Sequence, residues 1–290
     1  MTQPLDLAAA LAHLSVPLPP GRLVGEDGRE PLLWITDAPA PAGLWAQLHR
    51  AHQQSGLWPL LLTPLDRTGP DYRPWLSGEL YPSDGGAAEL YDPAALLRGW
   101  WQSGVSGEEG DHDGRDDDGD DDKGDDDAGD HDNGDDAEIA EALAPYGLTW
   151  PGTAPAVDVP DGAAGAEARG LADALQSVKD VRLGLVRADS GAEALAVCGW
   201  SGPTNHEDDI AKVAAVLADW ERRFGARVVD VGFDTLELSV PVPPATLAEA
   251  LPVAAEHISL CPDLVFQGTG SLTEYARELV GAHQWSFWWD

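Results

Sequence analysis

The sequence has 290 residues and a formal net charge of −34, from 51 acidic and 17 basic side chains. This acidity argues against direct binding to nucleic acid or to an anionic membrane, because the phosphates would be repelled. Only two cysteines are present, Cys198 and Cys261, which fits reduced thiols better than a disulfide framework. No segment has 18 consecutive apolar residues, so we expect no membrane span and a cytoplasmic protein.

Residues 1–107 are predicted to form an N-terminal α/β region. Apolar runs at 32–36 and 58–62 flank an amphipathic segment at 43–54, a pattern typical of a β-α-β unit. Further along, Asp92-Pro93 resembles an N-cap followed by the first helical residue, and it predicts a helix that reaches Trp100 and Trp101.

Residues 108–138 differ sharply in composition from the rest of the chain. They contain eighteen Asp or Glu residues against Arg115 and Lys123, and alanine is their main apolar residue apart from glycine. Such a segment cannot offset the entropy lost on ordering, so we predict an acidic, disordered, low-complexity insert. No register satisfies a calcium-binding EF-hand loop, although weak binding of cations or of a basic partner stays open as an alternative.

Residues 139–180 are predicted to be a helical connector, and residues 181–290 a C-terminal α+β domain. In this last block, apolar runs at 181–186 and 194–200 with turn residues between them predict a β-hairpin. The segment 210–224 has apolar residues at helical spacing and is followed by Gly225. It predicts a helix that ends before this glycine.

The remaining elements of the block follow in order. Strands are predicted at 227–231 and 235–240, joined by a tight turn with Gly232. Two capping boxes, at 246–249 and 271–274, open helices that should reach about residues 257 and 281. Pro252 either kinks the first of these helices or marks its true first turn. The aromatic segment 285–289 is predicted to be the last strand.

This order predicts an α+β fold. We expect a mostly antiparallel sheet with helices packed on one face in the C-terminal block, preceded by the N-terminal region that contains the β-α-β unit.

Several short motifs in the C-terminal block carry a family resemblance: WERRFGA at 220–226, GFDTL at 232–236, AEH at 255–257, CPD at 261–263 and WWD at 288–290. They resemble the actinobacterial family catalogued as domain of unknown function 4253. The motifs WPG at 150–152 and GLWP at 56–59 extend the likeness toward the N-terminus. The resemblance implies a shared fold, and it implies no activity, because the family has none established.

One constellation of reactive residue types stands out, formed by Glu256, His257, Cys261 and Asp263, of which Cys261, His257 and Asp263 are the candidate catalytic residues. An imidazole could activate the thiol as a nucleophile, with the carboxylate orienting the imidazole. A structural role is the main alternative, because free cysteine is among the most buried residue types. Zinc ligation is a third, and it would need His206 or Asp290 to complete the ligand set. We predict no cofactor and no metal.

The leading functional hypothesis is a non-catalytic binding or protein-interaction module, of an accessory or immunity-like kind, with an unidentified protein partner. The alternative is a thiol-dependent enzyme or hydrolase that uses Cys261 and His257. A weaker third hypothesis is that the acidic chain mimics nucleic acid toward a basic partner. The sequence has no glycine-rich phosphate loop, no Gly-x-Ser-x-Gly elbow and no His-Glu-x-x-His pair.

Overall fold

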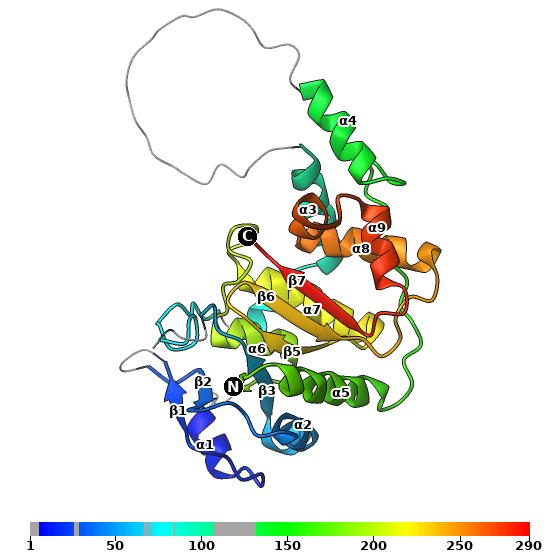
Figure 1. Cartoon of the computed structure of the whole chain (residues 1–290). Coiled ribbons are helices and arrows are strands. Elements are labelled where there is room, and N and C mark those ends of the chain that lie inside the picture. The colour runs from blue at the N-terminus through cyan, green and yellow to red at the C-terminus, as the bar shows by residue number, and fades with distance from the viewer. Residues whose placement is uncertain (1–5, 26–28, 67–68, 70, 84, 107–131) are drawn as a thin grey trace, which may run out of the picture.

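Short apolar segments from both halves of the chain form one seven-stranded mixed sheet (Figure 1). The computed structural model describes residues 6–25, 29–66, 69, 71–83, 85–106 and 132–290. The strands lie in the order β1-β2-β4-β3-β5-β6-β7, and all neighbours are antiparallel except β3 and β5. Their bounds are β1 Gly21–Val24, β2 Leu33–Thr36, β3 Leu57–Leu62, β4 Arg182–Arg187, β5 Arg227–Val231, β6 Thr235–Ser239 and β7 Gln284–Trp288.

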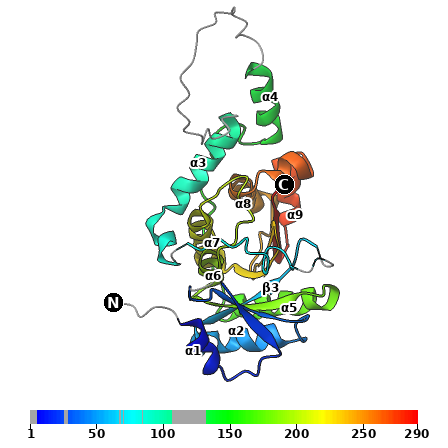
Figure 2. The same ribbon diagram turned by 90° about the vertical axis from the view of Figure 1, so that its left-hand side faces the viewer.

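Helices cover both faces of the sheet (Figure 2). Helices α1, α2 and α5 lie on one side, and α6, α7 and α8 lie on the other. The helices are α1 Leu7–Ala12, α2 Leu44–Ser55, α3 Pro93–Ser106, α4 Asp132–Ala142, α5 Ala163–Val178, α6 Gly191–Cys198, α7 Ile210–Phe224, α8 Leu247–Leu260 and α9 Leu272–Leu279, with a 3₁₀ turn η1 at Gly85–Leu90 and a π-helical turn η2 at Leu264–Thr269.

Strand β3 shows how the sheet separates two apolar cores. Successive side chains of a strand point to opposite faces. Leu60 and Leu62 accordingly enter the core under α6, α7 and α8, whereas Leu57 and Leu61 enter the core under α2 and α5. The strand is buried on both faces because it is central, and this explains its nearly continuous apolar sequence.

The predicted fold class is confirmed. The structure is α+β with a mostly antiparallel sheet, and β2, α2 and β3 form the N-terminal β-α-β unit. The two strands of that unit are not neighbours, because β4 lies between them and pairs with both. Within the C-terminal block, α6, α7 and α8 pack on the same face of the sheet.

The hairpin predicted from the runs at 181–186 and 194–200 is wrong. The first run forms β4, but the second lies mostly in α6. The Ser190 hydroxyl accepts a hydrogen bond from the Glu193 N–H at 3.1 Å, and the Glu193 carboxylate accepts one from the Asp189 N–H at 2.6 Å. These two bonds satisfy N–H groups at the helix start, and the alanine-rich run that follows favours helix.

The other predicted elements of the C-terminal block are present. Helix α7 begins after the N-cap Asp209 and ends before Gly225, as predicted. Strands β5 and β6 form the predicted antiparallel hairpin. Helix α8 begins after the N-cap Thr246, so Pro252 lies inside the helix and does not mark its first turn. Helix α9 ends two residues before Gly281, and β7 supplies the last strand.

The structure describes only the last residues of the predicted acidic insert. Residues 107–131 lie outside the described residues. Helix α4 begins at Asp132, so helical structure starts before the connector predicted at 139–180 and includes the last residues of the predicted insert.

No helix in the described ranges is long and apolar enough to cross a membrane.

The position of β3 predicts that the two halves of the chain depend on each other for folding. A fragment of residues 155–290 would lack β3, which pairs with β4 on one side and β5 on the other. We expect this fragment to show no cooperative urea transition. Strands β4 and β5 would lose their shared partner, and the apolar core under α2 would be exposed to solvent. A fragment that unfolds cooperatively at the midpoint of the full chain would contradict this expectation.

Candidate functional site

His257 is the polar member of an aromatic core. The residue is fully buried on α8, and its ring centroid lies 4.4 Å from that of Trp285 and 4.9 Å from those of Trp220 and Phe287. Its Nδ1 atom is 2.9 Å from the Tyr275 hydroxyl. Burial lowers the pKa of His257 to about 3, so the imidazole is neutral at physiological pH.

Cys261 and Asp263 form hydrogen bonds with other partners. The buried Cys261 thiol donates to the Trp288 carbonyl at 2.9 Å, and burial raises its pKa to about 12. Asp263 Oδ2 accepts from the Asp290 N–H at 3.0 Å. Among the described contacts, no hydrogen bond joins the thiol to His257. This arrangement favours a structural role for Cys261, because a protonated buried thiol is a poor nucleophile.

The residues weighed for zinc ligation also have protein partners. His206 Nε2 donates to the Ser259 carbonyl at 2.9 Å, and the Asn205 amide donates to the carbonyl of Asp290 at 2.9 Å. Over the described part of the chain, no three His, Cys, Asp or Glu side chains are grouped so that they could hold a metal ion.

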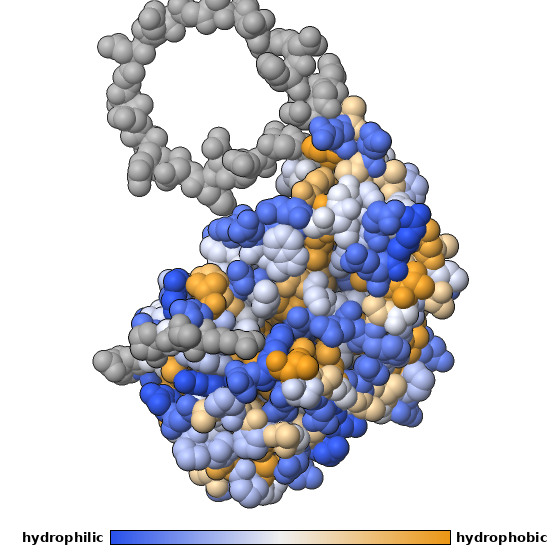
Figure 3. Space-filling model, viewed as in Figure 1, coloured by the Kyte–Doolittle hydropathy of each residue, from blue (hydrophilic) through white to orange (hydrophobic). Residues whose placement is uncertain are grey.

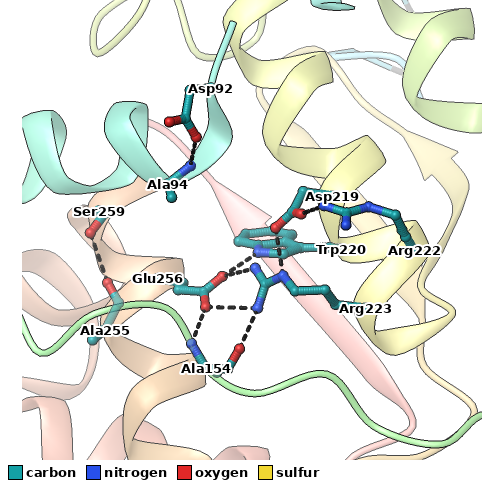
Figure 4. Close-up of polar contacts among 10 residues, drawn as sticks. All are labelled: Asp92, Ala94, Ala154, Asp219, Trp220, Arg222, Arg223, Ala255, Glu256 and Ser259. Atoms are coloured by element: carbon teal, nitrogen blue, oxygen red, sulfur yellow. Dashed lines mark hydrogen bonds and ion pairs between the residues drawn. The ribbon is translucent and has the colours of Figure 1, made fainter.

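Glu256, the neighbour of His257, is the centre of a buried charge cluster (Figure 4). Its carboxylate accepts hydrogen bonds from Trp220 Nε1 at 2.7 Å, from the Ala154 N–H at 2.6 Å, and from two nitrogens of Arg223 at 2.5 and 3.0 Å. Arg223 also donates to the Ala154 carbonyl at 2.8 Å and to Asp219 at 2.5 Å. We call Glu256, Arg223 and Ala154 the Glu256 clamp.

The clamp has a structural role. A buried ion pair is stable only when its geometry is good and its other hydrogen-bonding positions are filled, and both conditions hold here. The bonds join α7 and α8 to the segment that leads from α4 to α5. The Arg223 carbonyl adds a further contact to that segment, since it accepts from the Val157 N–H at 3.0 Å.

A polar cavity of about 440 Å³ lies where α2, β3 and α5 meet the start of α6, and we call it the α6 cavity. Three arginines reach it from three different elements: Arg50 from α2, Arg169 from α5 and Arg227 from β5. Its lining residues are His49, Arg50, His52, Gln53, Trp58, Gly165, Arg169, Asp189, Ser190, Glu221 and Arg227.

Aromatic packing fixes the two histidines of the cavity against Trp58. The rings of His49 and His52 meet the Trp58 indole edge-on, with centroids 5.4 and 4.9 Å away. His49 also stacks on Trp45 at 4.8 Å, and His52 Nε2 donates to the Ala188 carbonyl at 2.9 Å. Gly191 allows this close packing, because a Cβ there would lie only 3.0 Å from Trp58 Nε1.

Three buried polar atoms of the lining residues have no hydrogen-bond partner within the described structure: His49 Nδ1, Trp58 Nε1 and Glu221 Oε1. Buried polar atoms are normally paired, because an unpaired one costs about 1–3 kcal/mol. These three atoms lie on lining residues of one polar cavity, and six further such atoms lie elsewhere in the described structure.

The titratable groups of the cavity are strongly perturbed. Burial raises the pKa of Glu221 to about 7, although the charge of Arg227 and hydrogen bonds from the Ala192 N–H, the Gly191 N–H and the Ser190 hydroxyl oppose the shift. Burial also lowers the pKa of His49 to about 4, and the charge of Arg169 adds to that effect. Perturbed groups gathered in one cavity are typical of functional sites.

Sequence reasoning missed this site because its residues are scattered between positions 49 and 227 and form no motif. Two local signals pointed to parts of it. The Ser190-x-x-Glu193 pattern marks the start of α6, and the WERRFGA motif contains Glu221.

Two other cavities have different linings. One of about 700 Å³ beside β1 is lined largely by apolar residues, and its Arg22 pairs with Asp37. Another of about 480 Å³ lies between η2, α9 and β7, with Glu278 as its one charged residue. The charged lining residues of the first, Arg22, Arg29 and Glu30, come from β1 and the residues that follow it, whereas those of the α6 cavity come from α2, α5, α7, β5 and the segment before α6.

The motifs of the C-terminal block agree with a comparison against known families. Residues 182–290 match the model of a domain of unknown function (DUF4253). The resemblance expected from the motifs at 220–290 is thereby confirmed, whereas the motifs at 56–59 and 150–152 lie outside the match. The matched residues 182–290 contribute Asp189, Ser190, Glu221 and Arg227 to the α6 cavity, and the remaining lining residues precede them. No curated protein and no solved structure matches the chain.

The environment of Cys261 predicts slow alkylation of the native protein at neutral pH. A Cys198→Ala background isolates the signal of Cys261, and labelling should become fast only after denaturation, because burial keeps the native thiol protonated. A labelling time course followed by mass spectrometry measures this. Fast native labelling that slows in His257→Ala would contradict the structural role and would support the thiol-dependent enzyme.

Proposed function

We propose that the chain is a non-catalytic binding module whose ligand site is the α6 cavity. The observation that carries this proposal is the convergence of Arg50, Arg169 and Arg227 on a cavity that also contains buried, unpartnered polar atoms. Ligand sites are typically concave and have a few well-placed polar groups that fix the orientation of the ligand.

The size of the cavity supports a small ligand. Its volume of about 440 Å³ falls in the range of roughly 300–1,000 Å³ usual for small-molecule sites. A protein partner would have to insert a side chain or a chain terminus into it. On the face drawn in Figure 3, the described apolar residues lie in several separate groups among polar ones.

We place this module in the cytoplasm. The two cysteines support that location, because both are buried and neither is in a disulfide. The acidity of the chain supports a partner other than nucleic acid or an anionic membrane.

The test uses two matched glycine substitutions in α5. Gly165 lines the cavity, and a Cβ built there lies 3.1 Å from Arg169 Nη1 and 3.3 Å from His49 Cε1. Gly165→Phe should therefore fill the cavity. Gly170 lies in the same helix and is exposed, with open space around its Cβ position, so Gly170→Phe is the control.

The measurement is the shift in melting temperature caused by millimolar citrate, sulfate, acetate, glutamate and glucose. At least one of these should raise the melting temperature of the wild type and of Gly170→Phe but not of Gly165→Phe, because a ligand that binds only the folded state stabilises it. Equal shifts in all three proteins, or no shift in any of them, would contradict a ligand site in the α6 cavity.

A further inference from the structure

We infer that the α6 cavity binds a small molecule through an oxyanion group, a carboxylate or a phosphate, which lies between Arg50, Arg169 and the carboxyl group of Glu221. This inference rests on the proposed ligand site and names the chemistry that the site recognises.

The arginines of the cavity are available for an anion. Within the described residues, Arg169 forms no ion pair, and Arg50 donates only to the Ala46 carbonyl of its own helix, at 3.4 Å. Arg227 donates to the backbone carbonyls of Ala226 and Glu221. By contrast, other arginines of this acidic chain do have carboxylate partners, as Arg22, Arg73, Arg222, Arg223 and Arg277 show.

The start of α6 is already engaged by Glu221, whose carboxylate accepts hydrogen bonds from the Gly191 and Ala192 N–H groups and from the Ser190 hydroxyl. The amide groups of a helix N-terminus carry a partial positive charge and attract anions. Ser190, the N-cap of α6, lines the cavity together with Asp189. Guanidinium groups recognise carboxylates and phosphates through paired hydrogen bonds, so the arginines of the cavity select an oxyanion over a neutral or cationic group.

Glu221 sets the condition under which such an anion binds. Its Oε1 atom is buried without a partner and belongs to the cavity lining. In its acid form the carboxyl group can donate a hydrogen bond to the oxyanion, whereas in its ionised form it repels the anion. Burial raises the pKa of Glu221 to about 7, so both forms are present near neutrality.

The sign of the pH dependence follows from this. Below pH 7 Glu221 is mostly neutral and the anion binds well, and affinity falls as the pH rises through 7. The other charged or titratable groups that face Glu221 are His49, Arg50 and His52 from α2, Arg169 from α5, Asp189 before α6 and Arg227 from β5. His49 stays neutral over this range because its pKa is about 4. His52 also lines the cavity and is therefore varied separately.

The experiment is calorimetric titration of the full chain with sodium acetate and with sodium sulfate, between pH 6 and pH 8.5. Neither probe changes its own charge appreciably over this range, and the two represent carboxylate and tetrahedral oxyanion sources. We expect one or both to bind, with a dissociation constant that rises about tenfold per pH unit once Glu221 ionises.

Four variants complete the test. Glu221→Gln should bind the anion with little dependence on pH, and Arg169→Gln should lose at least about tenfold in affinity. His52→Gln should keep the pH dependence. Arg222→Gln is the control, because Arg222 is exposed on the same helix as Glu221 and pairs with Asp219 away from the cavity.

Three results would overturn the inference: no binding of either anion, a flat profile in the wild type, or an unchanged profile in Glu221→Gln. If neither anion binds while a neutral probe stabilises the wild type and Gly170→Phe but not Gly165→Phe, the ligand site stands and its oxyanion specificity is wrong. If no probe distinguishes Gly165→Phe from its control, the ligand site itself is wrong.

Discussion

The buried ion pair between Glu256 and Arg223 is the interaction on which the arrangement of the chain depends. It joins α7 and α8 to the segment that leads from α4 to α5. Isolated charges are costly to bury, and here each partner offsets that cost for the other while the Ala154 backbone and Trp220 fill the remaining positions. The pair therefore specifies where the segment can lie, as well as stabilising the core.

The α6 cavity depends indirectly on this arrangement. The anchored segment leads into α5, which packs against α2 and carries Gly165 and Arg169 into the cavity. Residues 182–290, which match the family model, supply only part of the lining, and α2, β3 and α5 supply the rest. The same elements complete the sheet, since β3 lies between β4 and β5. One packing arrangement thus produces both the shared sheet and the candidate ligand site.

Local patterns in the sequence predicted much of the fold but little of the site. Periodicity and caps located α7, α8 and α9, because these signals act within a few residues. The alanine-rich run at 194–200 was misassigned, since an apolar stretch fits strand and helix equally until the cap at Ser190 is weighed. The role of Glu256 in the clamp could not be predicted from the sequence, because its partners Arg223 and Ala154 are distant in sequence. The α6 cavity could not be predicted for the same reason, since only the fold brings Arg50, Arg169 and Glu221 together.

The most direct test of this account is a double-mutant cycle on the clamp, with Arg223→Met, Glu256→Met and the double variant compared by urea denaturation. Each single change should lower the free energy of unfolding by about 3–5 kcal/mol, because it leaves the other charge buried and unpaired. The double variant should lose less than the sum, with a coupling energy of at least about 2 kcal/mol. Losses that add to within about 0.5 kcal/mol would show that the two residues act independently, and would contradict the central place given to the clamp.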